Sequence, residues 1–163
     1  MRVLGIDPGS TITGYGIVEK DGARFRHVDN GLVRVSPSSP FAKRLQDIFS
    51  RIRQIIRELK PDVMAIEEVF FAKNPMSALK LGESRGVALL AAAEHELKVY
   101  EYSTREVKQA ITGYGQATKD QIQKMVRQLL NLPEVATEDA SDALAVALCH
   151  LQSSKMKELL EKV

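Results

Sequence analysis

Acidic residues at three places in the sequence could act together in chemistry. Asp7 ends an apolar run near the N-terminus, and a buried carboxylate is costly unless it is paired, hydrogen-bonded or bound to a metal. Glu67 and Glu68 end a second apolar run. Asp139 and Asp142 are three residues apart in a segment predicted to be helical, so they share one helix face. The pattern predicts a cluster of carboxylates.

A cluster of three or four carboxylates would require a cation, because the negative charges repel one another. Ligands that are all oxygen atoms select hard ions such as Mg²⁺ or Mn²⁺. Two such ions about 4 Å apart clamp the attacking and leaving oxygens of a phosphodiester in nucleases. We therefore expect Asp7 to be a metal ligand in a phosphodiester-cleaving site.

Each acid also has a purely structural interpretation. Asp139, in the first turn of its helix, would interact favourably with the helix dipole, and Asp142 could lie on a solvated face. Neighbouring strand residues face opposite sides, so one of Glu67 and Glu68 is expected to point away from the cluster. Asp7 is the hardest to explain structurally, since it ends an apolar strand with no obvious basic partner after it.

The elements that must position these acids follow from the apolar pattern. Strands are predicted at residues 2–7, 12–19, 23–35, 63–66 and 99–102. The first helix is predicted from Ser39-Pro40, with Ser39 as cap and Pro40 at the first position, to just before Pro61. Four more helices are predicted: over roughly 75–97, from Ser103 or Thr104, from Thr118 to about Leu130, and from Thr137 onward. This order predicts an α/β fold with a mixed five-stranded sheet, three antiparallel strands followed by parallel ones, and helices on both faces.

In this arrangement Asp7 and Glu67 would lie together if the first and fourth strands are neighbours, because sites gather at the carboxyl ends of strands. The last helix carries Ala140, Ala143, Ala145 and Ala147. Such small residues would let it approach the sheet closely and bring its acids to the same place.

Composition narrows the class of protein. At 163 residues, 44% apolar and 27% charged, the chain is expected to form a single domain over 1–163. No apolar stretch approaches the length of a membrane span, the N-terminus lacks the layout of a signal peptide, and Cys149 is the one cysteine. We expect a cytoplasmic protein with no membrane association.

The net charge of the chain is only +2, but its basic residues gather in three stretches, at 43–60, near 73–85 and at 105–127.

Four stretches together are specific to a known family. They are GIDPGSTITGYGIV, AIEEVFFAKNPMSALKLGESRGVALLAA, GYGQATKDQIQKMV and EDASDALAVALCH. With them the chain closely resembles the RuvC family of Holliday-junction resolvases over essentially its whole length. The resemblance implies an RNase H-like fold, a homodimer, the RuvA and RuvB branch-migration proteins as partners, and Mg²⁺-dependent nicking of four-way DNA junctions in recombination and repair.

The resemblance also assigns roles to individual residues. The catalytic, metal-binding acids map onto Asp7, Glu67, Asp139 and Asp142, which would hold two Mg²⁺ ions, with Mn²⁺ able to substitute. An activated water would attack phosphorus, leaving 5′-phosphate and 3′-hydroxyl ends. The family's aromatic at the junction corresponds to Phe70 and its two important lysines to Lys108 and Lys119. Further DNA contacts are expected from the basic residues Lys73, Lys80 and Arg85.

Two of these assignments leave alternatives open. Either Phe70 or its neighbour Phe71 could stack on unpaired bases, while the other enters the core. Lys108 or Lys119 would stabilise charge on the non-bridging phosphate oxygens, although any lysine can be simply solvated.

Three other functions compete with junction cleavage. GIDPGST also resembles the first phosphate loop of actin-like and Hsp70-like ATPases, but these need a second lobe that 163 residues cannot supply. A nuclease for RNA–DNA hybrids would share the acids. A junction-binding architectural protein would have no reason to collect acids against a polyanion.

The resemblance further implies two copies, since a junction is resolved by nicking two strands of like polarity. The segment from Leu79 to Leu97 is the predicted dimer helix. Gly82 and Gly86 lie on one face of it and would allow close packing, and Leu89 and Leu90 add apolar area.

Overall fold

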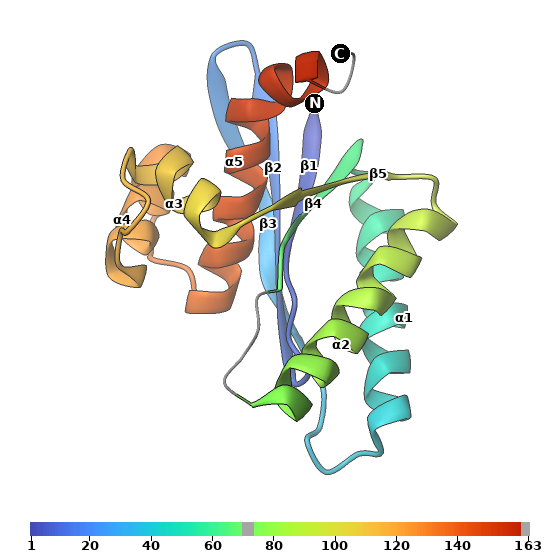
Figure 1. Cartoon of the computed structure of the whole chain (residues 1–163). Coiled ribbons are helices and arrows are strands. Elements are labelled where there is room, and N and C mark those ends of the chain that lie inside the picture. Colours follow the sequence, from blue (N-terminus) through green and yellow to red (C-terminus); the bar gives the residue numbers. More distant parts are fainter. Residues whose placement is uncertain (70–73, 161–163) are drawn as a thin grey trace.

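The computed structural model describes residues 1–69 and 74–160, with the side chains of 154–160 left aside. The strands are β1 (Arg2–Asp7), β2 (Ile12–Asp21), β3 (Arg24–Arg34), β4 (Val63–Glu67) and β5 (Lys98–Tyr102). The helices are α1 (Phe41–Leu59), α2 (Pro75–Glu94), α3 (Thr104–Thr112), α4 (Lys119–Leu130) and α5 (Glu138–Leu160) (Figure 1). They match the predicted elements in type and order.

The strands form one five-stranded sheet in the order β3-β2-β1-β4-β5. β1 and β3 pair antiparallel with β2, whereas β4 pairs parallel with β1 and β5 parallel with β4. The predicted mixed sheet is therefore confirmed. In the β1–β4 register Ile6 is opposite Ile66, so Asp7 and Glu67, the last residues of these two strands, lie side by side at the same edge of the sheet.

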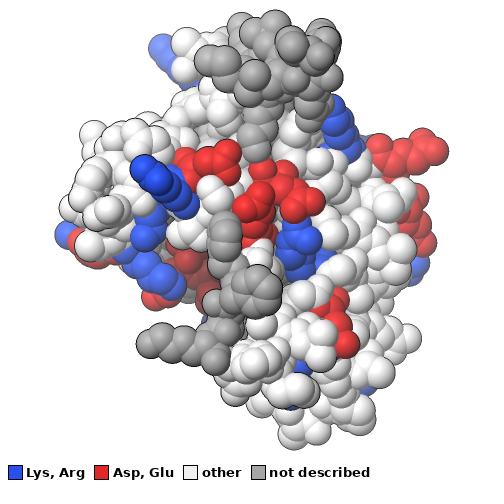
Figure 2. Space-filling model, viewed as in Figure 1, with Lys and Arg blue, Asp and Glu red and all other residues white. Residues whose placement is uncertain are grey.

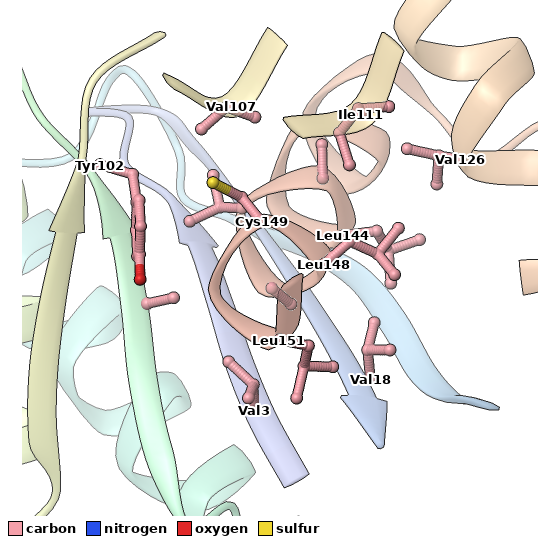
Figure 3. Packing of buried hydrophobic residues seen from close by; sticks show 14 of the residues in the cluster. Val3, Val18, Tyr102, Val107, Ile111, Val126, Leu144, Leu148, Cys149 and Leu151 are labelled. Carbon is pink, nitrogen blue, oxygen red and sulfur yellow. The ribbon is translucent and has the colours of Figure 1, made fainter. Parts of the chain in front are cut away.

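Helices cover both faces of the sheet, as predicted. α1 and α2 pack on one face and α3, α4 and α5 on the other (Figure 1). Successive side chains of β1 point to opposite faces of the sheet, so this strand contributes to two cores. Leu4 packs in the first core, under α1 and α2, and Val3 packs in the second core, under α3, α4 and α5. Figure 3 shows the second core, where α5 crosses the strands and Leu144 and Leu148 lie among residues of α3, α4 and the sheet.

α5 lies unusually close to the sheet, and glycines on the strands make this possible. A Cβ atom added to Gly5 of β1 would stand 1.9 Å from the carbonyl oxygen of Ala143. One added to Gly14 of β2 would stand 2.0 Å from the carbonyl oxygen of Asp139. Only glycine permits such an approach of two backbones. These two contacts set the distance between the first turns of α5 and the strands β1 and β2.

Helix caps agree with the sequence at two helices and differ at one. Ser103 caps α3 and Thr118 caps α4, each in a reciprocal capping box. The prediction that Ser39 caps α1 is wrong. Pro40 occupies the cap position without a side-chain bond, because Ser39 closes a preceding turn in which its N–H donates to the Ser36 carbonyl at 3.1 Å.

Within residues 1–69 and 74–160, no helix combines the length and apolar character that a membrane crossing requires.

Candidate active site

A pocket of about 300 Å³ opens where β1, β4, α3, α4 and α5 meet. Three of the predicted acids and both predicted lysines line it, together with one hydroxyl and two apolar side chains: Asp7, Glu67, Asp142, Lys108, Lys119, Thr104, Val107 and Ile122. Figure 2 shows acidic side chains gathered in the middle of this face, with basic side chains on either side. The fourth acid, Asp139, lies outside the lining but acts on the pocket through its charge.

Two carboxylates of the pocket, Asp7 and Asp142, lie in an environment that disfavours their negative charge. Burial, followed by the charges of Asp142, Glu67 and Asp139, raises the pKa of Asp7 from 3.8 to about 8. Burial is also the main cause that raises the pKa of Asp142, to about 6, and Lys119 opposes this rise. These acids therefore repel one another across a partly buried space.

Glu67 is oriented by the neighbouring elements. The hydroxyl of Thr104, the first residue of α3, donates a hydrogen bond to Glu67 Oε1. The guanidinium of Arg85 on α2 donates to the Glu67 carbonyl oxygen at 3.3 Å and pairs with Glu101 at 2.5 Å. Glu68 is not among the residues that line the pocket, which agrees with the expectation that one glutamate of the pair points away.

Lys119, the first residue of α4, faces the first turns of α5. Its ammonium group forms an ion pair with Glu138 and lies 3.9 Å from Asp142 Oδ2. Hydrogen bonding to Glu138 and the charges of Asp142, Glu138 and Asp7 all raise the pKa of Lys119. A positive charge is thus held at the edge of the carboxylate cluster.

Known proteins share this architecture. Residues 3–150 match the family model described as crossover junction endodeoxyribonuclease RuvC. The crossover junction endodeoxyribonuclease RuvC of Geobacter metallireducens is 56% identical over 163 residues, covering 100% of this chain and 99% of that protein. The chain belongs to the RuvC family. The expected RNase H-like α/β fold is consistent with this membership.

Solved structures of the family share this fold. The structure of Thermus thermophilus RuvC in complex with a Holliday junction substrate has a TM-score of 0.91 and 38% identity, with 96% of each chain covered. A second solved structure of Thermus thermophilus RuvC has a TM-score of 0.87 at the same identity, with 96% of this chain and 97% of that one covered.

The predicted DNA-contacting residues of this RuvC family member fall in three places. Lys108 and Lys119 line the pocket. Lys80 is exposed on α2, while Arg85 on the same helix is largely buried in its contacts with Glu67 and Glu101. Phe70, Phe71 and Lys73 lie outside the described residues.

Two further residues contribute to the site that the sequence did not single out: Thr104, which lines the pocket, and Glu138, which lies outside the lining and is ion-paired with Lys119. Thr104 looked like a helix start, and in the structure its hydroxyl also reaches Glu67. Glu138 carried a signal that could have found it, because it stands four residues before Asp142 and so shares a helix face with it.

The donor set fits a hard divalent cation by its chemistry. Asp7, Glu67 and Asp142 offer only oxygen ligands around one pocket, and burial together with the charges of the neighbouring acids raises the pKa of Asp7, which a bound cation would oppose. In the described part of the chain, no group of three or more His, Cys, Asp and Glu residues already has the arrangement of a metal site. A cation would have to draw the carboxylates together.

The raised pKa values predict how metal-free protein responds to pH. A carboxyl group whose pKa is higher in the folded state holds more protons there, so stability falls as pH rises through that range. We expect the melting temperature to fall between about pH 4 and pH 8, as Asp142 and then Asp7 lose their protons in the fold.

Thermal melts in a chelating buffer check this expectation. The Asp7→Asn variant provides the control, since its melting temperature should fall less steeply over the same range. A melting temperature of the unmodified protein that rises toward pH 8 would contradict the expected sign.

Proposed function

We propose that this chain is a Holliday-junction resolvase that nicks two strands of like polarity in a four-way DNA junction during recombination and repair. The observation that carries the proposal is the convergence of Asp7, Glu67 and Asp142, from three separate elements, on one pocket that also receives Lys108 and Lys119. The names of the relatives and the junction-bound Thermus thermophilus structure support the choice of substrate.

Asp7, Glu67, Asp139 and Asp142 would hold two Mg²⁺ ions, or Mn²⁺ in their place. When bound, such ions lower the pKa of a water molecule and neutralise charge on the cleaved phosphate. The chain's own part is to orient the carboxylates, through the Thr104 bond to Glu67 and the seating of α5 on the sheet. Lys108 and Lys119 would bind the non-bridging phosphate oxygens.

The products would be a 5′-phosphate and a 3′-hydroxyl, which a ligase can reseal. We further propose that the protein acts in the cytoplasm together with RuvA and RuvB, as the family resemblance implies. Phe70 and Lys73 remain proposed DNA contacts that lie outside the described residues, and Lys80 is a proposed contact exposed on α2.

A direct comparison of substrates tests the proposal. Synthetic four-way junction, linear duplex of the same sequence and RNA–DNA hybrid are incubated separately with the protein and Mg²⁺. The junction should be cut into two ligatable duplexes and the linear duplex should stay intact. Preferred cutting of the hybrid would identify a nuclease of another class, and binding without cutting would identify an architectural protein.

Symmetric nicking requires two sites, and α2 is the proposed helix of a homodimer. Leu79 and Leu90 are 56% and 58% exposed, which is unusual for leucine. Between them Gly82 and Gly86 are exposed, and a Cβ added to either would meet nothing within 4 Å in its own protomer. Leu89 differs from the expectation, because it packs against the core.

Replacing Gly86 with leucine should therefore weaken dimerisation without destabilising the protomer. The added side chain enters open space in one copy but would separate two helices that pack through their glycines. Sedimentation should show a shift toward monomer, and junctions should accumulate with a single nick. Lys43→Ala on α1 serves as a surface control. A monomeric unmodified protein that still cuts both strands together would overturn the proposed dimer.

A further inference from the structure

Glu138 forms an ion pair with Lys119 beside the pocket. It is the first residue of α5, four positions before Asp142, so both carboxylates lie on one face of the helix. The ammonium group of Lys119 comes from α4 and is ion-paired with Glu138 while lying 3.9 Å from Asp142 Oδ2. Lys119 is therefore held between a proposed metal ligand and an acid to which neither composition nor resemblance gave a role.

We propose that Glu138 is a positioning residue that anchors Lys119 at the mouth of the pocket, ready to bind a phosphate oxygen of the junction. The inference rests on the proposed function, because it acts through Lys119. A lysine side chain has four rotatable carbon–carbon bonds, and without an anchor its ammonium group would be drawn toward Asp142 and Asp7. The ion pair with Glu138 would keep the Lys119 ammonium group from pairing fully with Asp142 and Asp7, so that the carboxylate oxygens of these two acids stay available to bind metal ions.

The exposure of the pair means that it contributes little to folding, so its loss should leave the fold intact. The Lys119 and Glu138 side chains are 66% and 52% exposed, and exposed ion pairs add little to folding stability. The same helix α4 carries a second exposed pair, Asp120 with Lys124 at 2.7 Å, whose residues are absent from the pocket lining. That pair provides a matched control.

The test is a double-mutant cycle on the full chain with a synthetic four-way junction. Glu138→Gln, Lys119→Ala, the double variant and the control Asp120→Asn are compared. Three quantities are measured: the single-turnover cleavage rate with Mg²⁺, junction affinity without divalent metal, and the melting temperature. The first reports on positioning, and the other two would detect a general defect in binding or folding.

Glu138→Gln should cut about tenfold more slowly, since a small misplacement of a catalytic group is costly. Its junction affinity should stay equal or become tighter, because a negative charge near DNA is removed, and its melting temperature should not change. In the Lys119→Ala background the same substitution should have no further effect. Asp120→Asn should cut at the normal rate.

Several results would overturn the inference. These are a normal rate for Glu138→Gln, losses that multiply in the double variant, or parallel losses of affinity, rate and melting temperature. A normal rate for Lys119→Ala would remove the residue on which Glu138 is said to act. Failure of the proposed function itself is distinguishable, because the unmodified protein would then leave the junction uncut.

Discussion

Asp7→Asn is expected to lower junction cleavage by about 10²-fold or more while junction binding survives or becomes tighter. Asparagine keeps the shape of the side chain but removes its charge from the centre of the carboxylate cluster. The pKa of Asp7 is raised to about 8 mainly by burial, so the fold does not depend on its negative charge. Cleavage rates and gel-shift affinities on the same four-way junction measure the two effects separately.

Asp47→Asn is a matched control for this variant. Asp47 lies on α1, on the opposite face of the sheet, and is ion-paired with Lys43 in an exposed position. It should leave cleavage unchanged. A structural role for Asp7 would instead appear as a lower melting temperature of the metal-free Asp7→Asn protein, with binding and cutting lost to the same extent.

Gly5→Ala is expected to give the largest loss of stability, about 3 kcal/mol in the free energy of unfolding. The new methyl group would stand 1.9 Å from the carbonyl oxygen of Ala143 and 2.9 Å from the amide nitrogen of Ala147. Both atoms belong to the backbone of α5, so no side-chain rotation can relieve the overlap. Urea denaturation followed by circular dichroism measures the loss.

The displacement of α5 should also reduce cleavage, because the same helix carries Asp139 and Asp142. Gly82→Ala is the control for a glycine without neighbours. Its methyl group meets nothing within 4 Å in the protomer, and alanine favours a helix interior over glycine. Its protomer should be as stable as the unmodified one or slightly more so. Equal stability of Gly5→Ala would mean that α5 does not depend on this close contact.

The positions of the strands, the starts of two helices and the identity of the candidate acids could be predicted from local sequence. Alternating and continuous apolar runs define the strands, because side-chain period and burial act residue by residue. Ser103 and Thr118 define helix starts, since a cap involves only the next three residues. Asp7 could be predicted to be a functional residue, because burying a carboxylate at the end of an apolar strand costs free energy unless the group is paired, hydrogen-bonded or bound to a metal. The spacing of Asp139 and Asp142 likewise needs only the helical repeat.

Tertiary structure alone decided how these parts meet. The parallel pairing of β1 with β4 brings Asp7 beside Glu67, across some sixty residues of chain that no local rule connects. The buried alanines of α5 fit the expected close approach to the sheet, but the part played by Gly5 and Gly14 on the opposing strands emerged only from the structure. A glycine looks the same in a sequence whether or not a backbone lies against it.

The contacts of Thr104 with Glu67 and of Glu138 with Lys119 have the same origin. Each joins side chains on different elements, and each depends on where packing places α3, α4 and α5 relative to the sheet. The apolar cores of the two layers fix those positions. The sequence therefore determined which residues could do chemistry, and the packing of helices on the sheet decided which of them share a pocket.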